Sequence, residues 1–446
     1  MSWINTKLAA AGLIIGLQPA AFTADRQITQ GACGHMLTNI GVWSPDGQWI
    51  VYDIRSDEAG SLFDGTRIEA VNVETGEVKV LYQSKHDASC GVATWNPCAM
   101  KVVFILGPEN PAPEWQYSQS HRQGVMVDLS KLGVAMNLDA RDLTPPFTTG
   151  ALRGGSHVHV WDAAGYWVSF TYNDALVESD IRNVGVAIPK QPVQVAKNNS
   201  HNHDGECFSV VVTHTLASPR PGSDEIKRAC EEAWVGTNGY VRPDGTRQHR
   251  ALAFQGSVVT TNGETISEVF IADLPEKLTE PGDGPLAGTI DRRPSPPAGI
   301  TQRRLTFTTN QKYPGLQGPR HWLRSSPDGT QIAFLMKDDH GAVQLWTTSP
   351  NGSPPRQVTH NATDIASAFS WSPDGRFIAH IMDNSVCVTE VAAGKTIRLT
   401  PRSDDAHAPR PESCVFSPDG KRIAYVRRVA TDGQWFNQVF VTDKQP

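Results

Sequence analysis

The sequence lacks the signatures of several large protein classes. It has no Gly-x-Ser-x-Gly nucleophile elbow, which excludes an attached hydrolase domain of the prolyl-peptidase kind, and no His-Glu-x-x-His metalloprotease motif. Neither a P-loop nor the Gly-x-Gly-x-x-Gly dinucleotide fingerprint is present. Lysine and arginine form no cluster, and the formal net charge is −6, so we expect no nucleic-acid partner.

Long hydrophobic runs are scarce, and the one that stands out lies at the start of the chain. Lys7 precedes the apolar run 8–17, and small residues follow up to Ala24, which is the order of a secretory signal. We therefore predict a signal peptide over 1–24 and a mature, monomeric chain in the periplasm or outside the cell. If the segment is not a functional signal, the protein stays in the cytoplasm. No later stretch is long enough to span a membrane.

Cysteine is also sparse, and none of the seven residues forms a Cys-x-x-Cys pair. In an exported chain an odd number leaves at least one thiol unpaired. Disulfides between Cys90 and Cys98, or between Cys33 and Cys414, are compatible with the sequence. Free, buried thiols that pack as small hydrophobic side chains are the alternative.

The chain is rich in turn residues, with 38 glycines and 31 prolines, and many of them belong to a repeat. The pattern Trp-Ser-Pro-Asp-Gly followed by an alternating apolar strand recurs, complete or faded, in six segments: 43–52, 95–104, 161–170, 326–334, 371–379 and 416–425. The last three copies are about 45 residues apart, which is the length of one four-stranded propeller blade. Each Pro-Asp-Gly is expected to form the turn of a hairpin.

A second repeat, Arg-x-Leu-Thr or a close variant, precedes several of these turns and is expected to form the outermost strand of a blade. The copies are 141–144, 304–306, 356–359 and 398–400, with a fifth at 26–29. After the last turn the chain has room for only two more strands. Residues 26–29 are therefore expected to supply the missing outer strand and to close the ring.

These repeats predict an all-β fold with a single seven-bladed β-propeller over 25–446, although six or eight blades fit as well. The expected blades begin near residues 40, 90, 156, 205, 320, 365 and 412. The fourth is irregular: we expect its inner strand at 208–212 and its second strand at 250–254. Inserts are expected near 216–247, with a short helix over 223–232, and near 276–302.

The Trp-Ser-Pro-Asp-Gly turns with their Arg-x-Leu-Thr strands resemble the TolB-like (WD40-like, PD40) repeats of exported bacterial propellers. The segments 107–111, 152–159, 222–226 and 320–322 resemble more closely the uncharacterised bacterial YidR-type propellers. A more remote resemblance is to oligogalacturonate lyase propellers, which use histidine-rich metal coordination. These resemblances imply the fold, and only the last implies a chemistry.

Histidines gather on one face of the expected propeller. Nine of the 14 lie in or just before an expected inner strand: His35, His86, His157, His159, His201, His203, His321, His360 and His407. Loops on the same face add Arg55, Glu114, Asp174 and the pair His121-Arg122. Polar side chains that converge at the mouth of a closed β-structure form the default candidate site.

The pair His157 and His159 is the sharpest local feature. Residues two apart on a strand point to the same side, so both rings are candidate ligands of one Mn, Zn or Ca ion, with a third ligand from His203 or His321. Alternatively, one ring forms a hydrogen bond to a neighbouring blade and the other is solvated.

Arginine and histidine pairs on this face suit an anion. Arg122 and Arg320 are candidates to bind a carboxylate, His121 and His321 are candidates to transfer a proton, and Trp322 could stack on a sugar unless it belongs to the core. We assign substrate contacts to the set Arg55, Glu114, Asp174 and Trp322.

The working hypothesis is an exported lyase that cleaves acidic (uronate) oligosaccharides by β-elimination. An arginine or a metal ion would neutralise the uronate carboxylate, and a histidine or tyrosine would remove the C5 proton. The alternative is a non-catalytic propeller that binds a glycan or an envelope protein.

Overall fold

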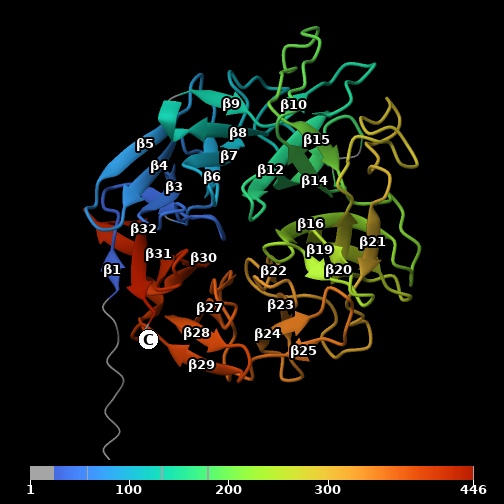
Figure 1. Cartoon of the computed structure of the whole chain (residues 1–446). Helices are drawn as coiled ribbons and strands as arrows, with labels where there is room; N and C mark the ends of the chain where they lie inside the picture. Colours follow the sequence, from blue (N-terminus) through green and yellow to red (C-terminus); the bar gives the residue numbers. More distant parts are fainter. Residues whose placement is uncertain (1–24, 58, 132–133, 178–179, 445–446) are drawn as a thin grey trace, which may run out of the picture.

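The computed structural model describes residues 25–444 except 58, 132–133 and 178–179. The signal peptide predicted over 1–24 lies outside the described residues. Seven four-stranded antiparallel sheets surround a central axis (Figure 1). The prediction of an all-β, seven-bladed propeller is thus confirmed. Within the described part of the chain the helical elements are two 3-10 turns, η1 (Leu129–Lys131) and η2 (Asp405–His407), and no helix is long and apolar enough to cross a membrane.

The blades are given from the innermost strand outward. Blade 1 comprises β2 (Gly34–Met36), β3 (Trp49–Arg55), β4 (Arg67–Asn72) and β5 (Val78–Gln83). Blade 2 comprises β6 (Cys90–Trp95), β7 (Lys101–Leu106), β8 (Gln123–Asp128) and β9 (Ala135–Asn137). Blade 3 comprises β12 (Gly154–Trp161), β13 (Val168–Asp174), β14 (Asn183–Ile188) and β15 (Phe208–Val211). Blade 4 comprises β16 (Ile226–Trp234), β19 (Arg250–Val259), β20 (Thr265–Leu274) and β21 (Thr301–Arg304).

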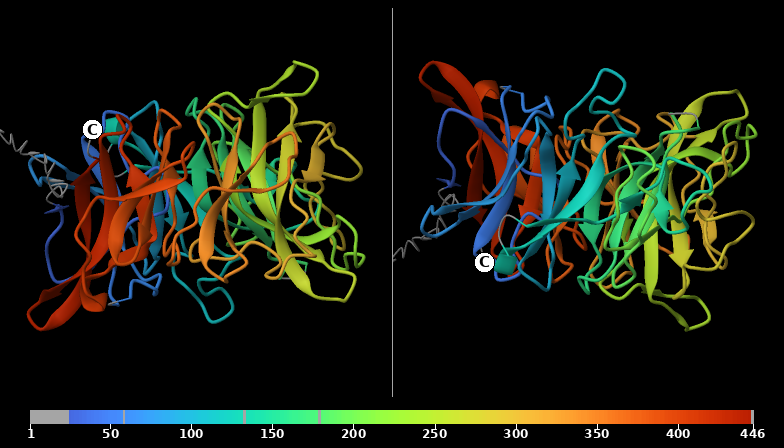
Figure 2. Two further views of the ribbon diagram at one scale, coloured as in Figure 1. Left: turned by 90° about the horizontal axis from the view of Figure 1, so that it is seen from below. Right: turned by 90° about the horizontal axis from the view of Figure 1, so that it is seen from above.

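The remaining blades complete the ring. Blade 5 comprises β22 (Arg324–Ser325), β23 (Ile332–Lys337), β24 (Val343–Thr348) and β25 (Arg356–Gln357). Blade 6 comprises β26 (Ser370–Trp371), β27 (Phe377–Met382), β28 (Ser385–Glu390) and β29 (Lys395–Arg398). Blade 7 comprises β30 (Pro409–Phe416), β31 (Arg422–Thr431), β32 (Gln434–Asp443) and β1 (Arg26–Gln27). Figure 2 shows the disc from its edge, with the β31–β32 hairpin extending beyond one face.

Strand β1 closes the ring, as the sequence predicted. Arg26 pairs with Val441 of β32, and the Ile28 backbone N–H donates to the Val439 carbonyl at 2.8 Å. The first and last strands of the described chain thus share one sheet, so the edge of β32 is covered.

The Ser-Pro-Asp-Gly repeat forms the turn between the first and second strands. In blade 1, Gly47 has a φ of 68°. The Asp46 carboxylate accepts the Gln48 N–H at 3.0 Å, and the Ser44 hydroxyl accepts the Trp49 N–H at 2.9 Å. Glycine adopts this backbone conformation without steric cost, which explains why a glycine recurs at every well-formed turn.

Three tryptophans connect neighbouring blades, and two of them, Trp43 and Trp371, belong to the repeat. The indole N–H groups of Trp43, Trp234 and Trp371 donate to inner-strand carbonyls of the preceding blade at 3.0–3.1 Å. Hydrophobic clusters also cross the blade boundaries, since Tyr52 of blade 1 packs in one cluster with Val426 and Val441 of blade 7. The core therefore lies between the blades.

Blade 4 differs from the expectation. The helix predicted over 223–232 is wrong, because residues 226–234 form β16, the inner strand, which pairs with β19. The Ser223 hydroxyl donates to the Arg220 carbonyl in a turn. Residues 208–211 form β15, the outer strand of blade 3, so blade 4 begins at 226 and not near 205. Pairing with the long strand β19 overrides the local helix preference of a segment rich in alanine and glutamate. The predicted insert 216–247 therefore contains an inner strand, followed by the hairpin β17 (Tyr240–Val241) and β18 (Arg247–Gln248).

Two smaller expectations also change. Residues 141–144 do not form the outer strand of blade 2, because β9 does; Arg141 lies in β10 (Ala140–Arg141), which pairs in parallel with β11 (Ala151–Leu152). The copies at Arg304, Arg356 and Arg398 do lie in outer strands. All seven cysteines are free thiols, so neither candidate disulfide forms.

Candidate functional site

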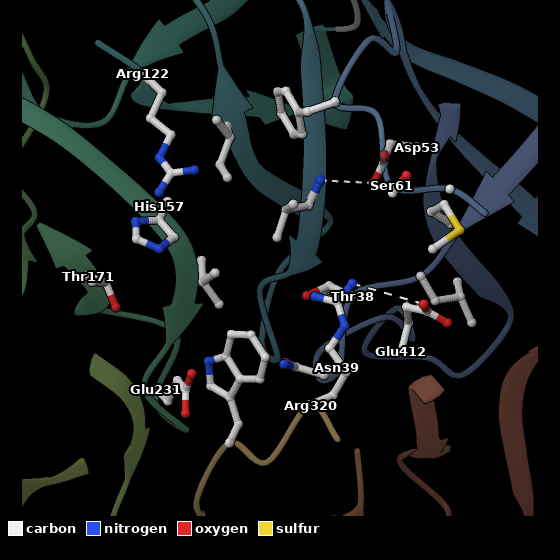
Figure 3. A pocket seen from close by; sticks show the side chains of 18 of the residues that line it. Thr38, Asn39, Asp53, Ser61, Arg122, His157, Thr171, Glu231, Arg320 and Glu412 are labelled. Atoms are coloured by element: carbon white, nitrogen blue, oxygen red, sulfur yellow. Dashed lines mark hydrogen bonds and ion pairs between the residues drawn. The ribbon is translucent and has the colours of Figure 1, made fainter. Parts of the chain in front are cut away.

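A polar cavity of about 410 Å³ occupies the central axis on the face opposite the Pro-Asp-Gly turns (Figure 3). Blades 1, 2, 3, 4, 5 and 7 contribute its lining residues. Of its seven aspartate, glutamate and arginine residues, Arg122, Arg182 and Arg320 lie in segments that connect strands, and the other four lie in strands. Its size suits a ligand of one or two sugar rings.

The same backbone distortion shapes three walls of the cavity. Val92 of β6, Val158 of β12 and Glu231 of β16 have φ values of 58°, 54° and 58°, and the pairing register of each strand shifts at this point. All three residues line the cavity. A β-branched residue with positive φ is an outlier, and such strained bulges concentrate at functional sites.

The bulge at Val158 separates the two histidines that the sequence placed together. His157 lines the cavity, whereas His159 is fully buried beside it, with Nε2 at 3.0 Å from the Ser156 hydroxyl. The expectation that residues 157 and 159 share one side fails because the alternation of a regular strand is interrupted between them.

The proposed metal ligands do not fit one ion. His203 pairs through its backbone with Arg141, and its Nδ1 lies 3.3 Å from the Asp204 carbonyl, outside the cavity lining. Burial lowers the pKa of His157 well below its usual range and lowers those of His159 and His203 to about 3. Among the described residues no group of three histidine, cysteine or acidic side chains is arranged to hold a metal.

Arg122 is the most exceptional side chain of the site. It is 9% exposed, its Nη1 donates to the Tyr117 hydroxyl at 3.2 Å, and its Nε has no partner among the described residues. Burial lowers the pKa of Arg122, and the positive charge of nearby Arg182 lowers it further. In Figure 3 the guanidinium lies beside the ring of His157. This wall therefore presents positive charge without a carboxylate partner among the described residues.

Arg141 holds the backbone that carries Arg122. This fully buried guanidinium donates from Nη2 to the carbonyls of His121 and Arg122, at 3.0 and 2.6 Å. Its Nε lies 3.4 Å from the carbonyl of Gly154, at the start of β12. Arg141 thus connects the loop of blade 2 to the strand that carries His157.

The other cavity arginines have acidic neighbours. Arg55 forms a 2.5 Å ion pair with Asp53. Arg320 lies 4.0 Å from Glu412, a carboxylate that Arg410 approaches at 3.3 Å. Both predicted residues, Arg55 and Arg320, line the cavity.

Aromatic side chains complete the lining. Trp322 lies in the cavity wall, with a buried indole N–H that has no partner among the described residues. Phe63 and Tyr117 stack at 4.5 Å between ring centroids and join loops of blades 1 and 2. Trp322 thus contacts the cavity and is not solely a core residue.

Besides His159 and His203, four predicted residues lie outside the lining. His121 stacks on Trp115 at 3.7 Å, and Glu114 is exposed in the same loop. Asp174 is buried in a 2.9 Å ion pair with Arg153. His321 lies next to the lining, with Nε2 3.8 Å from the carboxylate of Glu231.

Sequence reasoning missed Arg182, Glu231 and Glu412, which all line the cavity. Arg182 could have been found, since it immediately precedes a third strand (β14) just as Arg122 immediately precedes β8. Glu231 lay in the segment predicted as a helix. Whether Glu412 faces the cavity depends on the register of β30.

Comparisons with known proteins agree with the expected resemblance. Residues 89–203 match the model of a protein family of unknown function, DUF3748. The chain is 47% identical over 412 residues to the uncharacterized protein YidR of Escherichia coli (strain K12), covering 90% of this chain and 95% of that protein.

Among solved structures, a putative TolB from Agrobacterium tumefaciens aligns with a TM-score of 0.40 at 14% identity, covering 85% of this chain and 98% of that one. An oligogalacturonate lyase in complex with manganese aligns with a TM-score of 0.45 at 10% identity, covering 96% of this chain and 95% of that one.

Proposed function

Because the chain belongs to the family of the uncharacterized protein YidR, whose name states no activity, we propose from the cavity itself that this protein binds a small acidic sugar. The observation that carries the proposal is Arg122, a nine-tenths buried cation that faces the cavity and whose Nε has no hydrogen-bond partner in the described part of the chain. An unpaired buried charge is costly, and a bound carboxylate would compensate it.

The neighbouring groups support a hydroxylated ligand. The cavity adds hydrogen-bond acceptors at Glu231 and Glu412, each with one buried carboxylate oxygen that accepts no hydrogen bond from the described residues. Trp322 offers an indole N–H and an aromatic surface. A sugar acid carries a carboxylate for Arg122 and hydroxyl donors for the two glutamates.

Isothermal titration calorimetry with glucuronate and galacturonate tests the proposal, with glucose as the neutral control. We expect Arg122→Gln to weaken uronate binding by about 10- to 100-fold, the contribution of a charge-assisted hydrogen-bonded pair. Arg356→Gln, at an exposed arginine of the outer strand β25, is the matched control and should bind like wild type. Equal affinity of the Arg122→Gln variant and wild type would refute the proposal.

Cleavage of a uronate oligosaccharide by β-elimination is a second candidate, favoured by the imidazole of His157. Its lowered pKa keeps the ring neutral at neutral pH, its ring hydrogen-bonds the Thr171 backbone, and Nδ1 has no partner among the described residues. Nδ1 would remove the C5 proton while Arg122 binds the carboxylate. The C5 electron pair would form the C4–C5 double bond, and the glycosidic oxygen at C4 would leave with the proton of the Tyr117 hydroxyl.

The lyase candidate predicts an unsaturated product with ultraviolet absorbance. We expect this signal with oligogalacturonate in wild type and its loss in His157→Ala, with binding retained. Tight uronate binding without any unsaturated product would leave a binding protein and refute the lyase.

We propose that this function is exercised in the periplasm or outside the cell, because residues 1–24 have the composition of a secretory signal. Cell fractionation and N-terminal sequencing of the mature chain test the location. Recovery of the uncleaved chain in the cytoplasm would refute it.

A further inference from the structure

A second guanidinium faces the cavity across from Arg122. In Figure 3, Arg122 lies with His157 at one side of the cavity, and Arg320 lies with Glu412 toward the other. Both arginines belong to the lining. They differ in exposure, since Arg122 is buried and the Arg320 side chain is 48% exposed. Of these two arginines, Arg122 therefore lies in the wall of the cavity and Arg320 at its rim.

The charge of Glu412 is already compensated by another residue. Arg410 Nη2 donates to Glu412 Oε1 at 3.3 Å, and the same nitrogen donates to the Ala59 carbonyl at 2.9 Å, which fixes its position. Arg320 Nη2 lies 4.0 Å from that same Oε1, beyond hydrogen-bond distance. A half-exposed pair at this separation is weak. Arg320 therefore remains available to a second anion.

The backbone holds Arg320 at the rim in an unusual conformation. Its φ is 49°, and the Trp322 N–H donates to the Arg320 carbonyl at 3.0 Å in a tight turn. Arginine rarely adopts positive φ, and such strained residues are retained where the surrounding structure requires them. The turn places Arg320 and Trp322 together on the cavity.

We propose that the cavity selects ligands with a carboxylate at each end and hydroxyl groups between them, and that Arg320 determines this selectivity. The inference rests on the proposed binding of sugar acids at Arg122. Arg122 would bind the first carboxylate in the wall, Arg320 would bind the second at the rim, and the glutamates would accept hydroxyl protons. The ligand class is therefore a sugar diacid.

Calorimetric titration with two linear six-carbon acids tests this: gluconate has one carboxylate and glucarate has two. We expect wild type to bind glucarate about fivefold more tightly than gluconate, the worth of one partly exposed charge pair. Arg320→Gln should remove this preference, because glucarate loses the partner of its second carboxylate. Glu412→Gln keeps an acceptor oxygen for the ligand hydroxyl and removes the carboxylate that competes for Arg320, so glucarate affinity should rise by about two- to threefold. Arg356→Gln is again the control.

The outcomes separate this inference from the proposed function. Glucarate bound no more tightly than gluconate, or a preference that persists in Arg320→Gln, overturns the selectivity while uronate binding at Arg122 stands. If no sugar acid binds, both proposals fail. Thermal unfolding of each variant shows whether a lost preference reflects misfolding, and the opposite signs expected for Arg320→Gln and Glu412→Gln cannot both arise from a damaged fold.

Discussion

Replacement of Arg122 by methionine should make the ligand-free protein more stable while it removes ligand binding. In the structure, Arg122 loses its hydration and gains one hydrogen bond, to the Tyr117 hydroxyl at 3.2 Å. The pKa of Arg122 is lowered by burial and by Arg182, so the folded state disfavours its charge. Methionine keeps much of the side-chain volume and carries no charge.

The magnitude follows from comparing the two effects. Loss of the hydrogen bond costs about 1 kcal/mol, and Tyr117 faces the cavity, where water can replace the donor. Removal of an uncompensated buried charge contributes on the order of 2 kcal/mol in the opposite direction. We therefore expect the free energy of unfolding to rise by about 1 kcal/mol and the melting temperature by about 1 °C.

Arg141 is the matched control, because it is also a buried arginine but has structural partners. Its Nη2 is bound by the carbonyls of His121 and Arg122, and the charge of Asp139 acts on it. Arg141→Met would leave these groups unpaired, at a cost of about 3–5 kcal/mol. Urea denaturation of both variants distinguishes the roles. If Arg122→Met destabilised the protein as much as Arg141→Met, the conclusion that Arg122 is held in place for a ligand would be wrong.

Three further predictions concern the closing strand, a buried acid and the two histidines. Deletion of residues 25–29 should expose the edge of β32, lower stability by several kcal/mol and cause concentration-dependent association, measured by denaturation and size-exclusion chromatography. Burial raises the pKa of Glu232 to about 7. The stability that protonated Glu232 contributes is therefore complete below the pKa that this residue has in the unfolded chain, and it is lost as the pH rises through 7. Between pH 4 and pH 8 the free energy of unfolding of Glu232→Gln should thus rise by on the order of 3 kcal/mol relative to that of wild type. Parallel pH–stability curves of the two proteins would contradict this. His159→Ala should lower the free energy of unfolding by about 2–4 kcal/mol without altering uronate affinity, whereas His157→Ala should abolish the unsaturated product, keep uronate binding and destabilise the fold less; calorimetry, product absorbance and urea denaturation measure these effects.

The architecture was predictable because each blade repeats a short local signal. A Ser-Pro-Asp-Gly turn needs only four residues, and Gly47 shows why glycine is required at its end, since φ is 68° there. The closing role of residues 26–29 followed from counting strands. Blade 4 was misassigned because its inner strand, β16, has no such turn after it, and its composition favours a helix. Only pairing with β19, 20 residues along the chain, makes that segment a strand.

The site was predictable in position but not in detail. The topology alone placed Arg55, Arg122, Arg320, His157 and Trp322 at the mouth of the channel, and these residues do line the cavity. The direction of an individual side chain depends on strand register, which a single inserted residue changes. The sequence carries no visible mark for a bulge at Val158, because valine is a residue that normally disfavours positive φ.

The repeated bulge explains how a propeller that is narrow at its axis can hold a chemically specific cavity. At each bulge a residue that lines the cavity is followed by a buried one. In β12, His157 lines the cavity and His159 is buried. In β16, Glu231 lines the cavity and Glu232 is buried. One position of each pair can therefore vary to suit a ligand, while the other maintains contact with its neighbours. His159 and Glu232 are bonded to Ser156 and Thr171, respectively. Thr171 belongs to β13 of blade 3, so its bond to Glu232 joins two blades, and Ser156, which lies in the same strand as His159, donates to Asp139 at 3.0 Å. Because these buried polar groups tie the bulged strands to other parts of the fold, the stability of the ring and the shape of the binding site are coupled. Substitutions at the buried positions should then alter stability first, and substitutions at the lining positions should alter ligand choice first.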